Sequence, residues 1–291
     1  MKNSRAQTKK TIFRIVLYAL AFLILVFVLA PYCWLVISSV STKADLLTIP
    51  MRWFPRHPTF DNYASIFFNN SNSTLNTASQ FKTAFLNSLQ VALIVTVICL
   101  VIGLMATYAF SRLRFRGRRP AFYSVLAMQM LPPVALIIPL YMIVLQLHLM
   151  DRKLTLVLVY LSFILPFVIW IMKGYMDSIP VEMEEAARID GCGRLRAFIY
   201  VMLPIASSGL AATTIFAFIL SWNEFFYALQ LTSTLASKTL PFVITEFSSK
   251  YGADYIMTST GGVLASLPPV LLALIFQKYI ISGLTAGAVK G

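Results

Sequence analysis

A stretch of the chain between two long apolar runs carries an unusual number of acidic side chains. The stretch reads SIPVEMEEAARIDGCGRLRAFIYVMLP and covers residues 178–204. Loops that only orient neighbouring apolar segments are expected to be basic, so fixed carboxylates here suit docking to a soluble partner protein. A solvated loop with interfacial helices is the alternative. Five of the eleven acidic residues lie in or directly before the stretch: Asp177, Glu182, Glu184, Glu185 and Asp190.

The same stretch predicts a short helix, a sharp turn and a second short helix. Ser178 is a typical N-cap and Pro180 suits a first helical turn. Gly191 and Gly193 can adopt backbone conformations that are closed to other residues, which predicts the end of the first helix. The second helix is expected over 194–203. One face of the first helix has little bulk, which suits insertion into a cleft; its residues are Met183, Ala186, Ala187 and Asp190.

The composition indicates a membrane protein. The chain has 291 residues, of which 58% are hydrophobic and only 12% are charged, whereas a soluble domain carries about 25% charged residues. The net charge of +13 would suit nucleic acid, but the basic residues cluster beside apolar runs, so no nucleic-acid partner is expected. Cys33, Cys99 and Cys192 are far apart without a CxxC pair and are interpreted as small apolar side chains, not a metal site.

The elements that position the acidic stretch are long apolar segments. A helix needs about 20 apolar residues to cross a bilayer, because its backbone groups must be bonded internally. Six segments meet this requirement, so the predicted fold is an all-α integral membrane protein with six transmembrane helices in one domain over 1–291. The predicted spans are 11–37, 84–110, 121–145, 154–172, 205–226 and 261–281.

Basic residues in short loops predict the orientation. The N-terminal residues are rich in lysine and arginine, and SRLRFRGRRP between the second and third spans packs five arginines from Arg112 to Arg119. Both regions are expected in the cytoplasm. The loop 173–204, between spans four and five, is then cytoplasmic too, as are both termini. The arginines also suit attraction to anionic lipids, and contact with an ATPase is a weaker alternative.

The acidic stretch resembles a known motif. EAARIDGCGRLRAFIYVMLP is similar to the EAA loop of bacterial ABC importer permeases, in which Glu-Ala-Ala is followed after three residues by Gly and later by Ile, one residue and Leu-Pro. The spacing holds throughout, with Val201 in the Ile position. Cys192 and Ser208 are further departures, where a small Ala and a further Pro are common. All three changes are mild.

The resemblance implies a coupling role for this loop. In the family the loop docks into a groove on an ATP-binding subunit and carries its closure to the spans. The matching positions, which the resemblance assigns to ATPase coupling, are Glu185, Ala186, Ala187, Asp190, Gly191, Leu203 and Pro204. It also implies two ATPase subunits, a second permease in a heterodimer, an extracytoplasmic solute-binding protein and a bacterial cytoplasmic (inner) membrane location.

Three further segments resemble the carbohydrate branch of these permeases, which is MalG-like: SWNEFFYAL, KTLPFVITEF and the tail GLTAGAVKG. They imply a sugar or oligosaccharide substrate. An ABC importer permease for a non-sugar solute is the alternative, and an ion-coupled secondary transporter is the next, although no paired acid and base suitable for a proton relay occurs within the spans.

The motifs of common enzyme classes do not occur. There is no GxxxxGK[ST] phosphate loop and no HExxH, and the only histidines, His57 and His148, lack metal-ligand spacing. The chain is therefore expected to be a transporter subunit, not an enzyme, that binds no cofactor itself. The resemblance implies that ATP and magnesium are bound by the partner ATPases.

Polar residues within or near the spans are candidates for a translocation path. They are Asn87, Gln129, Asn223 and Glu224, with helix packing as the alternative and, for Glu224, a position at the outer interface. Gln129 precedes Pro132 and Pro133, which should break or kink the third span. The aromatic residues beside Glu224 suit either sugar stacking or an interfacial belt; they are Trp222, Phe225, Phe226 and Tyr227.

Overall fold

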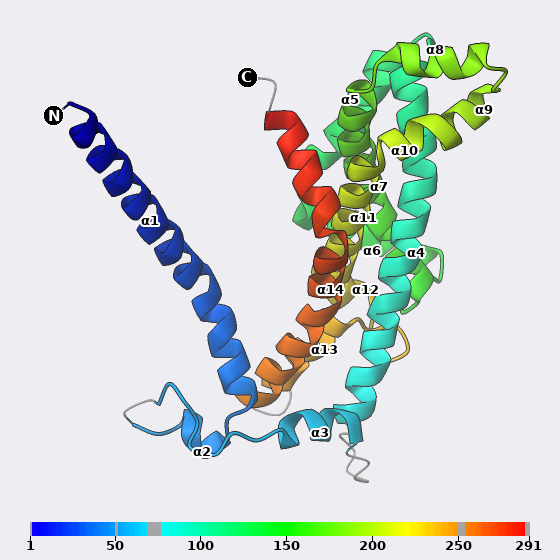
Figure 1. Cartoon of the computed structure of the whole chain (residues 1–291). Coiled ribbons are helices and arrows are strands. Elements are labelled where there is room, and N and C mark those ends of the chain that lie inside the picture. The colour runs from blue at the N-terminus through cyan, green and yellow to red at the C-terminus, as the bar shows by residue number, and fades with distance from the viewer. Residues whose placement is uncertain (1, 50–51, 69–76, 250–253, 289–291) are drawn as a thin grey trace. The chain divides into compact units, whose positions relative to one another are not determined.

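The computed structural model describes residues 2–49, 52–68, 77–249 and 254–288, and the regular structure within these ranges is entirely helical. This agrees with the predicted all-α class. The chain folds into two compact units, Met1–Ala78 with Ile244–Leu264 and Ser79–Val243 with Ala265–Gly291. Helices α13 (Leu240–Ser249) and α14 (Tyr255–Ala288) contribute to both units (Figure 1). The division into one domain, expected above, stays a prediction.

The first unit begins with one long helix, α1 (Lys2–Ser39), followed by α2 (Lys43–Leu46) and α3 (Asp61–Phe68). The end of α1 is tied to α3, because the Asn62 Nδ2 group donates to the Ser39 carbonyl at 2.8 Å and the Ser39 and Tyr63 hydroxyls lie 2.6 Å apart. Apolar side chains cover the exposed surface of α1. A helix with this surface and length fits a span that faces lipid.

The length and apolarity of the helices support four continuous spans in the described residues. These are Lys10–Ser39, Gln80–Arg112, Lys153–Asp177 and Tyr255–Tyr279. Two further helix pairs are apolar enough but bent, Arg118–Met130 with Pro133–Gln146 by 97° and Arg194–Ile205 with Ser207–Trp222 by 82°. Counting each bent pair as one span gives six, so the coarse membrane class agrees with the prediction and the exact count of six stays a prediction.

The third predicted span is not one continuous helix. It consists of α5 (Arg118–Ala127), the short helix η1 (Met128–Met130) and α6 (Pro133–Gln146). The break falls at Leu131 and Pro132, whose backbones are extended. Proline has no N–H to continue the helical hydrogen bonds and disfavours a helical residue before it. The predicted break at the two prolines is thereby confirmed.

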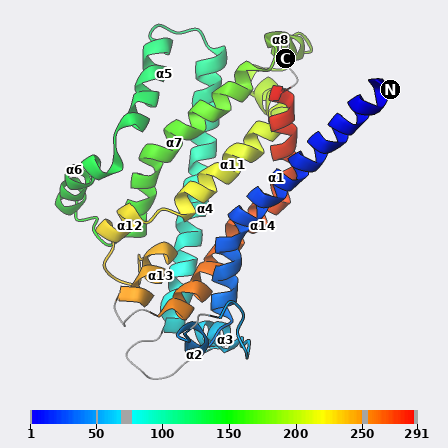
Figure 2. The ribbon, with the colours of Figure 1, turned by 90° about the vertical axis from the view of Figure 1, so that its left-hand side faces the viewer.

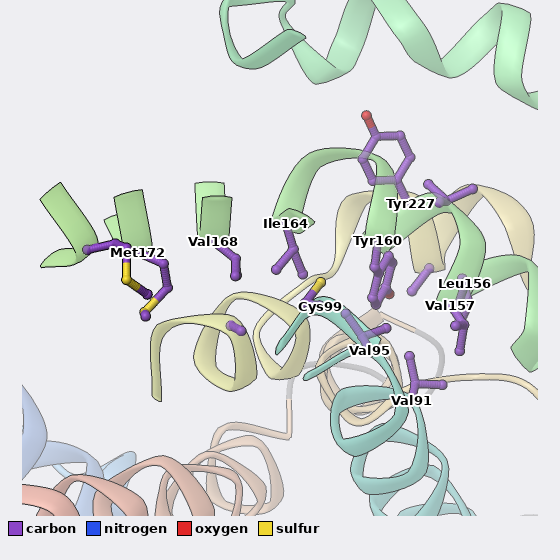
Figure 3. Close-up of a cluster of buried hydrophobic side chains, with 14 of the residues drawn as sticks. Val91, Val95, Cys99, Leu156, Val157, Tyr160, Ile164, Val168, Met172 and Tyr227 are labelled. Carbon is purple, nitrogen blue, oxygen red and sulfur yellow. The ribbon is translucent and has the colours of Figure 1, made fainter. Parts of the chain in front are cut away.

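Helices of the second unit bury the main apolar core. Helices α4 (Thr77–Arg112) and α7 (Lys153–Asp177) contribute most of it, together with α11 (Ser207–Trp222) and α12 (Phe226–Leu231). Figure 3 shows Cys99 of α4 beside Ile164 of α7, with Tyr160 nearby. Cys99 is fully buried there, so its interpretation as a small apolar side chain holds.

The observed helix ends differ from several predicted spans. Helix α7 continues to Asp177, beyond the predicted residue 172, and α11 stops at Trp222 instead of residue 226. In the last turn of α7 the Met176 carbonyl accepts a hydrogen bond from Arg112 at 3.0 Å. After α11, Glu224 accepts backbone N–H groups that start α12. Side chains thus satisfy backbone groups at helix ends that the apolar runs do not mark.

Close packing of α11 on α7 depends on Gly209. A Cβ atom at this position would lie within 2.7 Å of the Tyr175 ring, whereas one at Gly174 of α7 would meet nothing within 4 Å. We expect Gly209→Ala to destabilise the purified protein by about 1–3 kcal/mol through overpacking. The matched control Gly174→Ala should be neutral or stabilising by up to about 1 kcal/mol. Thermal unfolding in detergent compares the two, and equal midpoints would contradict the prediction.

Candidate functional site

The segment between α7 and α11 forms two short helices joined by a tight turn. The first helix is α8 (Val181–Ile189), and the second region consists of α9 (Arg194–Ala197), a π-helical turn η2 (Phe198–Met202) and α10 (Leu203–Ile205). Figure 1 shows α8 and α9 projecting at one end of the second unit. The predicted helix–turn–helix is therefore present, with a π-helical segment where a regular second helix was expected.

The turn depends on Gly191. Its φ of +89° lies in the left-handed region, which glycine adopts without the steric penalty that a Cβ atom brings. The turn closes by hydrogen bonds from the Cys192 N–H to the Ala187 carbonyl at 3.0 Å and from the Gly191 N–H to the Arg188 carbonyl at 3.2 Å. Space does not limit this position, because an added Cβ would meet nothing within 4 Å. The backbone conformation alone therefore selects glycine.

The start of α8 differs from the prediction. Ser178 does not cap α8, because its hydroxyl donates to the Tyr175 carbonyl at 2.7 Å at the end of α7. Pro180 takes the N-cap position of α8 and makes no side-chain hydrogen bond there. Ser178 and Pro180 do mark the boundary between α7 and α8, as the sequence predicts. The sequence does not reveal that Ser178 completes the preceding helix, because α7 is longer than its apolar run.

The motif residues divide between an exposed and a buried face of α8. Glu185, Ala186, Asp190 and Gly191 are exposed, whereas Ala187 is buried. Leu203 is half-buried and Pro204 is exposed, and both lie in α10 next to the bend that precedes α11. Large apolar side chains stand on the same exposed segment, with Ile189 86% and Leu195 70% exposed. An exposed apolar and charged surface of this kind fits a protein partner.

The buried face holds an ion pair that the sequence analysis did not single out. The Arg112 Nε atom at the end of α4 lies 3.4 Å from the Glu184 Oε2 atom of α8, and the two side chains are only 7% and 9% exposed. The Tyr108 hydroxyl of α4 lies 2.6 Å from the other Glu184 oxygen and donates to it. These three residues, which we call the α4–α8 anchor, fix α8 to the end of α4.

Arg112 connects a third helix to the α4–α8 anchor. One of its terminal nitrogens donates to the Met176 carbonyl at 3.0 Å and to the Ile179 carbonyl at 2.7 Å. These contacts satisfy carbonyls at the C-terminal end of α7, where a cation also suits the helix dipole. Helices α4, α7 and α8 are thus joined through one guanidinium.

Beside the anchor a cavity of about 520 Å³ separates α8 from the end of α4. Its lining combines the anchor residues with Glu185, Arg188 and Arg194 from the exposed segment. Charged groups of both signs therefore surround the same opening. The arrangement offers a partner protein fixed positions for charged contacts, and it supplies neither a nucleophile nor a paired acid and base for catalysis.

The comparison with known proteins identifies the family. Residues 99–286 match the model of the binding-protein-dependent transport system inner membrane component, which is well over half of the chain. The chain belongs to this family. As a transport-system subunit, it is a membrane-embedded permease and not an enzyme, as predicted.

Relatives agree along nearly the full length. The permease is 35% identical to the diacetylchitobiose uptake system permease protein DasC of Streptomyces coelicolor, over 90% of this chain and 91% of that protein. It is 36% identical to the trehalose transport system permease protein SugB of Mycobacterium tuberculosis, over 92% and 95%, and 34% identical to the sulfoquinovosyl glycerol transport system permease protein SmoH of Agrobacterium fabrum, over 93% and 92%. The ABC permease resemblance is thereby confirmed.

A solved structure shares the fold. The crystal structure of a bacterial ABC transporter involved in the import of the acidic polysaccharide alginate contains a chain that superposes with a TM-score of 0.76, at 22% identity over 92% of this permease and 96% of that chain. At this identity the likeness concerns the fold alone. It supports the helical arrangement described above.

The four residues proposed for a translocation path have different hydrogen-bond partners. Asn87 is only 3% exposed, and its amide donates to the Leu235 and Lys238 carbonyls at 3.0 Å each. Gln129 donates to the Phe163 carbonyl at 2.5 Å, and Asn223 is exposed at the end of α11. Glu224 accepts from the Tyr227 and Ala228 N–H groups at 2.9 and 3.2 Å. Their role in a path stays a prediction.

The aromatic residues near Glu224 require a correction. Trp222 is 1% exposed, packs against Phe85 and Phe218, and donates its indole N–H to the Ala265 carbonyl at 3.0 Å. Tyr227 is also buried and stacks on Phe163. Neither sugar stacking nor an interfacial belt fits these two rings. A run of aromatics in the sequence does not reveal which of them point into the core.

The turn between α6 and α7 binds the polar segment that precedes α13. Asp151, with φ +59°, accepts hydrogen bonds from the Ser233 and Thr234 N–H groups at 2.9 and 3.0 Å, from the Thr234 hydroxyl at 2.6 Å and from the Ser237 hydroxyl. Partial burial raises the pKa of the carboxyl, but these hydrogen bonds outweigh it and hold the pKa well below its ordinary value. The sequence analysis did not single out Asp151.

The depressed pKa of Asp151 predicts that its hydrogen bonds stabilise the folded protein to an extent that depends on pH. Because the folded-state pKa of Asp151 is depressed, the contribution is present above the unfolded pKa of about 3.9 and is lost as pH falls below it. Asp151→Asn should cost about 1–3 kcal/mol at pH 7, and its deficit against the wild type should shrink as pH falls below about 4. Thermal unfolding across pH in detergent measures both, and Asp61→Asn, which alters an exposed carboxylate, is the control. A deficit that stays constant with pH would contradict the prediction.

Proposed function

We propose that this permease is one transmembrane subunit of an ATP-driven importer for a carbohydrate. Three relatives named above belong to uptake or transport systems for diacetylchitobiose, trehalose and sulfoquinovosyl glycerol. All three names denote sugars or a sugar derivative, and the alignments cover at least nine-tenths of each chain. This supports an oligosaccharide or sugar derivative as the substrate class of the present permease.

The observation that carries the coupling role is the anchored and exposed helix α8. Its buried side joins α4 and α7 through Arg112 and Glu184, while its other side exposes Glu185 and the nearby Ile189. An ATP-binding subunit that holds the exposed side can therefore move two long helices without a flexible joint. ATP and magnesium are bound by that subunit, and this permease contributes the docking surface.

The assembly follows from this role. Two ATP-binding subunits, a related second permease and an extracytoplasmic solute-binding protein complete the importer in the bacterial inner membrane. The α8 end of the spans and both termini face the cytoplasm, as the basic residues near them indicate. Closure of the ATPases displaces α8, the spans reorient, and the binding protein releases its sugar into a path between the two permeases, along which Gln129 and Asn223 are the exposed candidates.

Affinity purification tests the assembly. The tagged permease is extracted from its native membranes in mild detergent, and the co-purifying proteins are identified by mass spectrometry, with untagged membranes as the control. We expect an ATPase with a phosphate loop and a second permease carrying an EAA loop, in stoichiometric amounts. Recovery of the permease as a homo-oligomer without an ATPase would overturn the proposal and favour an ion-coupled transporter.

A separate measurement tests the proposed substrate class. The solute-binding protein of the same system is screened by thermal shift against oligosaccharides, sugar derivatives, amino acids and short peptides. We expect stabilisation by a carbohydrate only. Stabilisation by an amino acid or a peptide would retain the importer and replace the substrate class.

A further inference from the structure

The connection between α4 and α5 concentrates positive charge without matching carboxylates. Arg112 is used in the α4–α8 anchor, but four more arginines follow within seven residues. Across the described ranges, no ion pair joins any of these four to an acidic side chain. The four residues are Arg114, Arg116, Arg118 and Arg119. No carboxylate of the described residues therefore neutralises their charge, and the contact of Arg118 within this part of the protein is one hydrogen bond from its guanidinium to the Leu113 carbonyl at 3.3 Å.

Two cavities flank Arg118 and Arg119. One of about 440 Å³ is lined by these two residues with Arg114, Phe115 and Gly117. The other, of about 180 Å³, is lined by the same two arginines with Phe110, Phe122 and Tyr123. Lys173 also borders the smaller cavity, but its ammonium is already paired with Asp177 and lies 5.1 Å from the Phe122 ring centre. Both openings thus combine guanidinium donors with aromatic walls.

The backbone strengthens the preference for an anion. Gly117, at φ +84°, is the N-cap of α5, and no side chain accepts a hydrogen bond from the first turn of this ten-residue helix. A helix N-terminus carries a partial positive charge that suits an anion. In the first turn of α5 at most the Arg119 N–H is free to donate, because the Arg118 N–H bonds to the Phe115 carbonyl at 3.4 Å and Pro120 has no N–H. Guanidinium groups bind phosphate oxygens through paired hydrogen bonds. The charge, the donors and the helix end together match a phosphate group.

The elements that follow α5 along the chain present an apolar surface. Met128 and Met130 of η1 are exposed, as are Val134 and Ile138 of α6, which follow α5 along the chain. Figure 2 shows α5 and the end of α4 together at one end of the second unit, with α6 further along. A ligand that fills the arginine cavities and also covers this surface needs an anionic head and long apolar chains.

We propose that the cavities on both sides of Arg118 and Arg119 bind the phosphate group of an anionic phospholipid, whose acyl chains cover the exposed surface of η1 and α6. The arginine pair contacts the phosphate oxygens, and Phe122 and Tyr123 face the glycerol region. The site is a lipid site of the permease itself. It depends on neither the sugar nor the ATPase, so its test is independent of the proposed importer function.

Native mass spectrometry of the purified full-length permease, with any subunits that co-purify and stripped of lipid in detergent, provides the test. Dioleoylphosphatidylglycerol is titrated as the anionic probe and dioleoylphosphatidylcholine as the zwitterionic one. Two single variants have the same change in charge: Arg119→Gln removes a residue that lines both cavities, and Arg116→Gln removes one that lines neither. Both side chains are exposed, so both variants are expected to fold, which thermal unfolding checks.

The two variants distinguish lipid binding at these cavities from general attraction of anionic lipid to the positive charge of the loop. Arg119→Gln should weaken binding of the anionic lipid about fivefold, which corresponds to about 1 kcal/mol for one interfacial charge, whereas Arg116→Gln should change it less than twofold. The zwitterionic lipid should bind weakly to all three proteins. Equal losses in the two variants would overturn the site, and displacement of the lipid by low-millimolar inorganic phosphate would overturn the lipid assignment in favour of a free-phosphate site.

Discussion

Valine in place of Gly191 should reduce sugar uptake at least tenfold while the protein is still made and inserted. The left-handed backbone at this residue costs an ordinary residue about 1–2 kcal/mol and is a steric outlier for a β-branched one. The turn between α8 and α9 must therefore change its conformation, and the exposed residues on its two sides lose their relative placement. Uptake of labelled substrate in whole cells and the ATPase activity of the purified complex measure the effect.

Gly193 supplies a matched control two residues away. Its φ of −66° and ψ of 161° lie in a region that valine readily adopts, and an added Cβ would meet nothing within 4 Å. Gly193→Val should therefore retain most of the uptake, and Gly191→Asn should recover part of it because asparagine tolerates the left-handed region. If both valine variants transported equally well, the turn at Gly191 would have no part in coupling.

The second large effect is expected at the α4–α8 anchor. Glu184→Gln keeps the shape of the side chain and one hydrogen bond to Tyr108 but leaves the buried Arg112 guanidinium without its counter-charge. Removal of one partner of a buried ion pair costs about 3–5 kcal/mol. We expect a lower unfolding midpoint in detergent and, at a temperature where the variant is still folded, ATP hydrolysis that drives less transport, because α8 is no longer fixed to α4 and α7.

The neighbouring Glu185 is the natural control for this prediction. It has the same chemistry and lies on the same helix, but it is exposed, so Glu185→Gln should shift stability by no more than about 0.5 kcal/mol. Any loss of transport in that variant would come from docking and not from folding. A ratio of transport to ATP hydrolysis that stays at the wild-type value in Glu184→Gln would remove the anchor from the coupling pathway.

The local backbone conformation of the loop 173–204 can be predicted from its residue types. Glycine and proline restrict or extend the backbone choices of single residues, and these effects act over one or two peptide units. The positions of the turn at Gly191 and of the break at Pro132 and Pro133 were therefore predictable. The apolar runs were equally informative, because each helix that crosses a bilayer must be long and apolar irrespective of its neighbours.

Side chains that bond across helices were not predictable in the same way. Ser178 looks like an N-cap for α8 and instead completes α7, and Trp222 looks like an interfacial ring and is buried against Phe85 and Phe218. Each residue has two or more chemically reasonable partners. Which partner it takes depends on the length and rotation of a helix distant in the sequence.

The adjacent Glu184 and Glu185 of α8 show most clearly what the sequence determines and what the tertiary structure decides. By itself the sequence determined an all-helical membrane protein with a charged helix–turn–helix segment, because apolarity, charge and backbone preference act locally and leave a recognisable pattern. Only the tertiary structure decided that Glu184 faces inward to Arg112, which lies far away in the sequence, while Glu185 faces outward. Adjacent residues of one type differ in a helix only by a rotation of about 100°, and the packing of α8 against α4 sets that rotation.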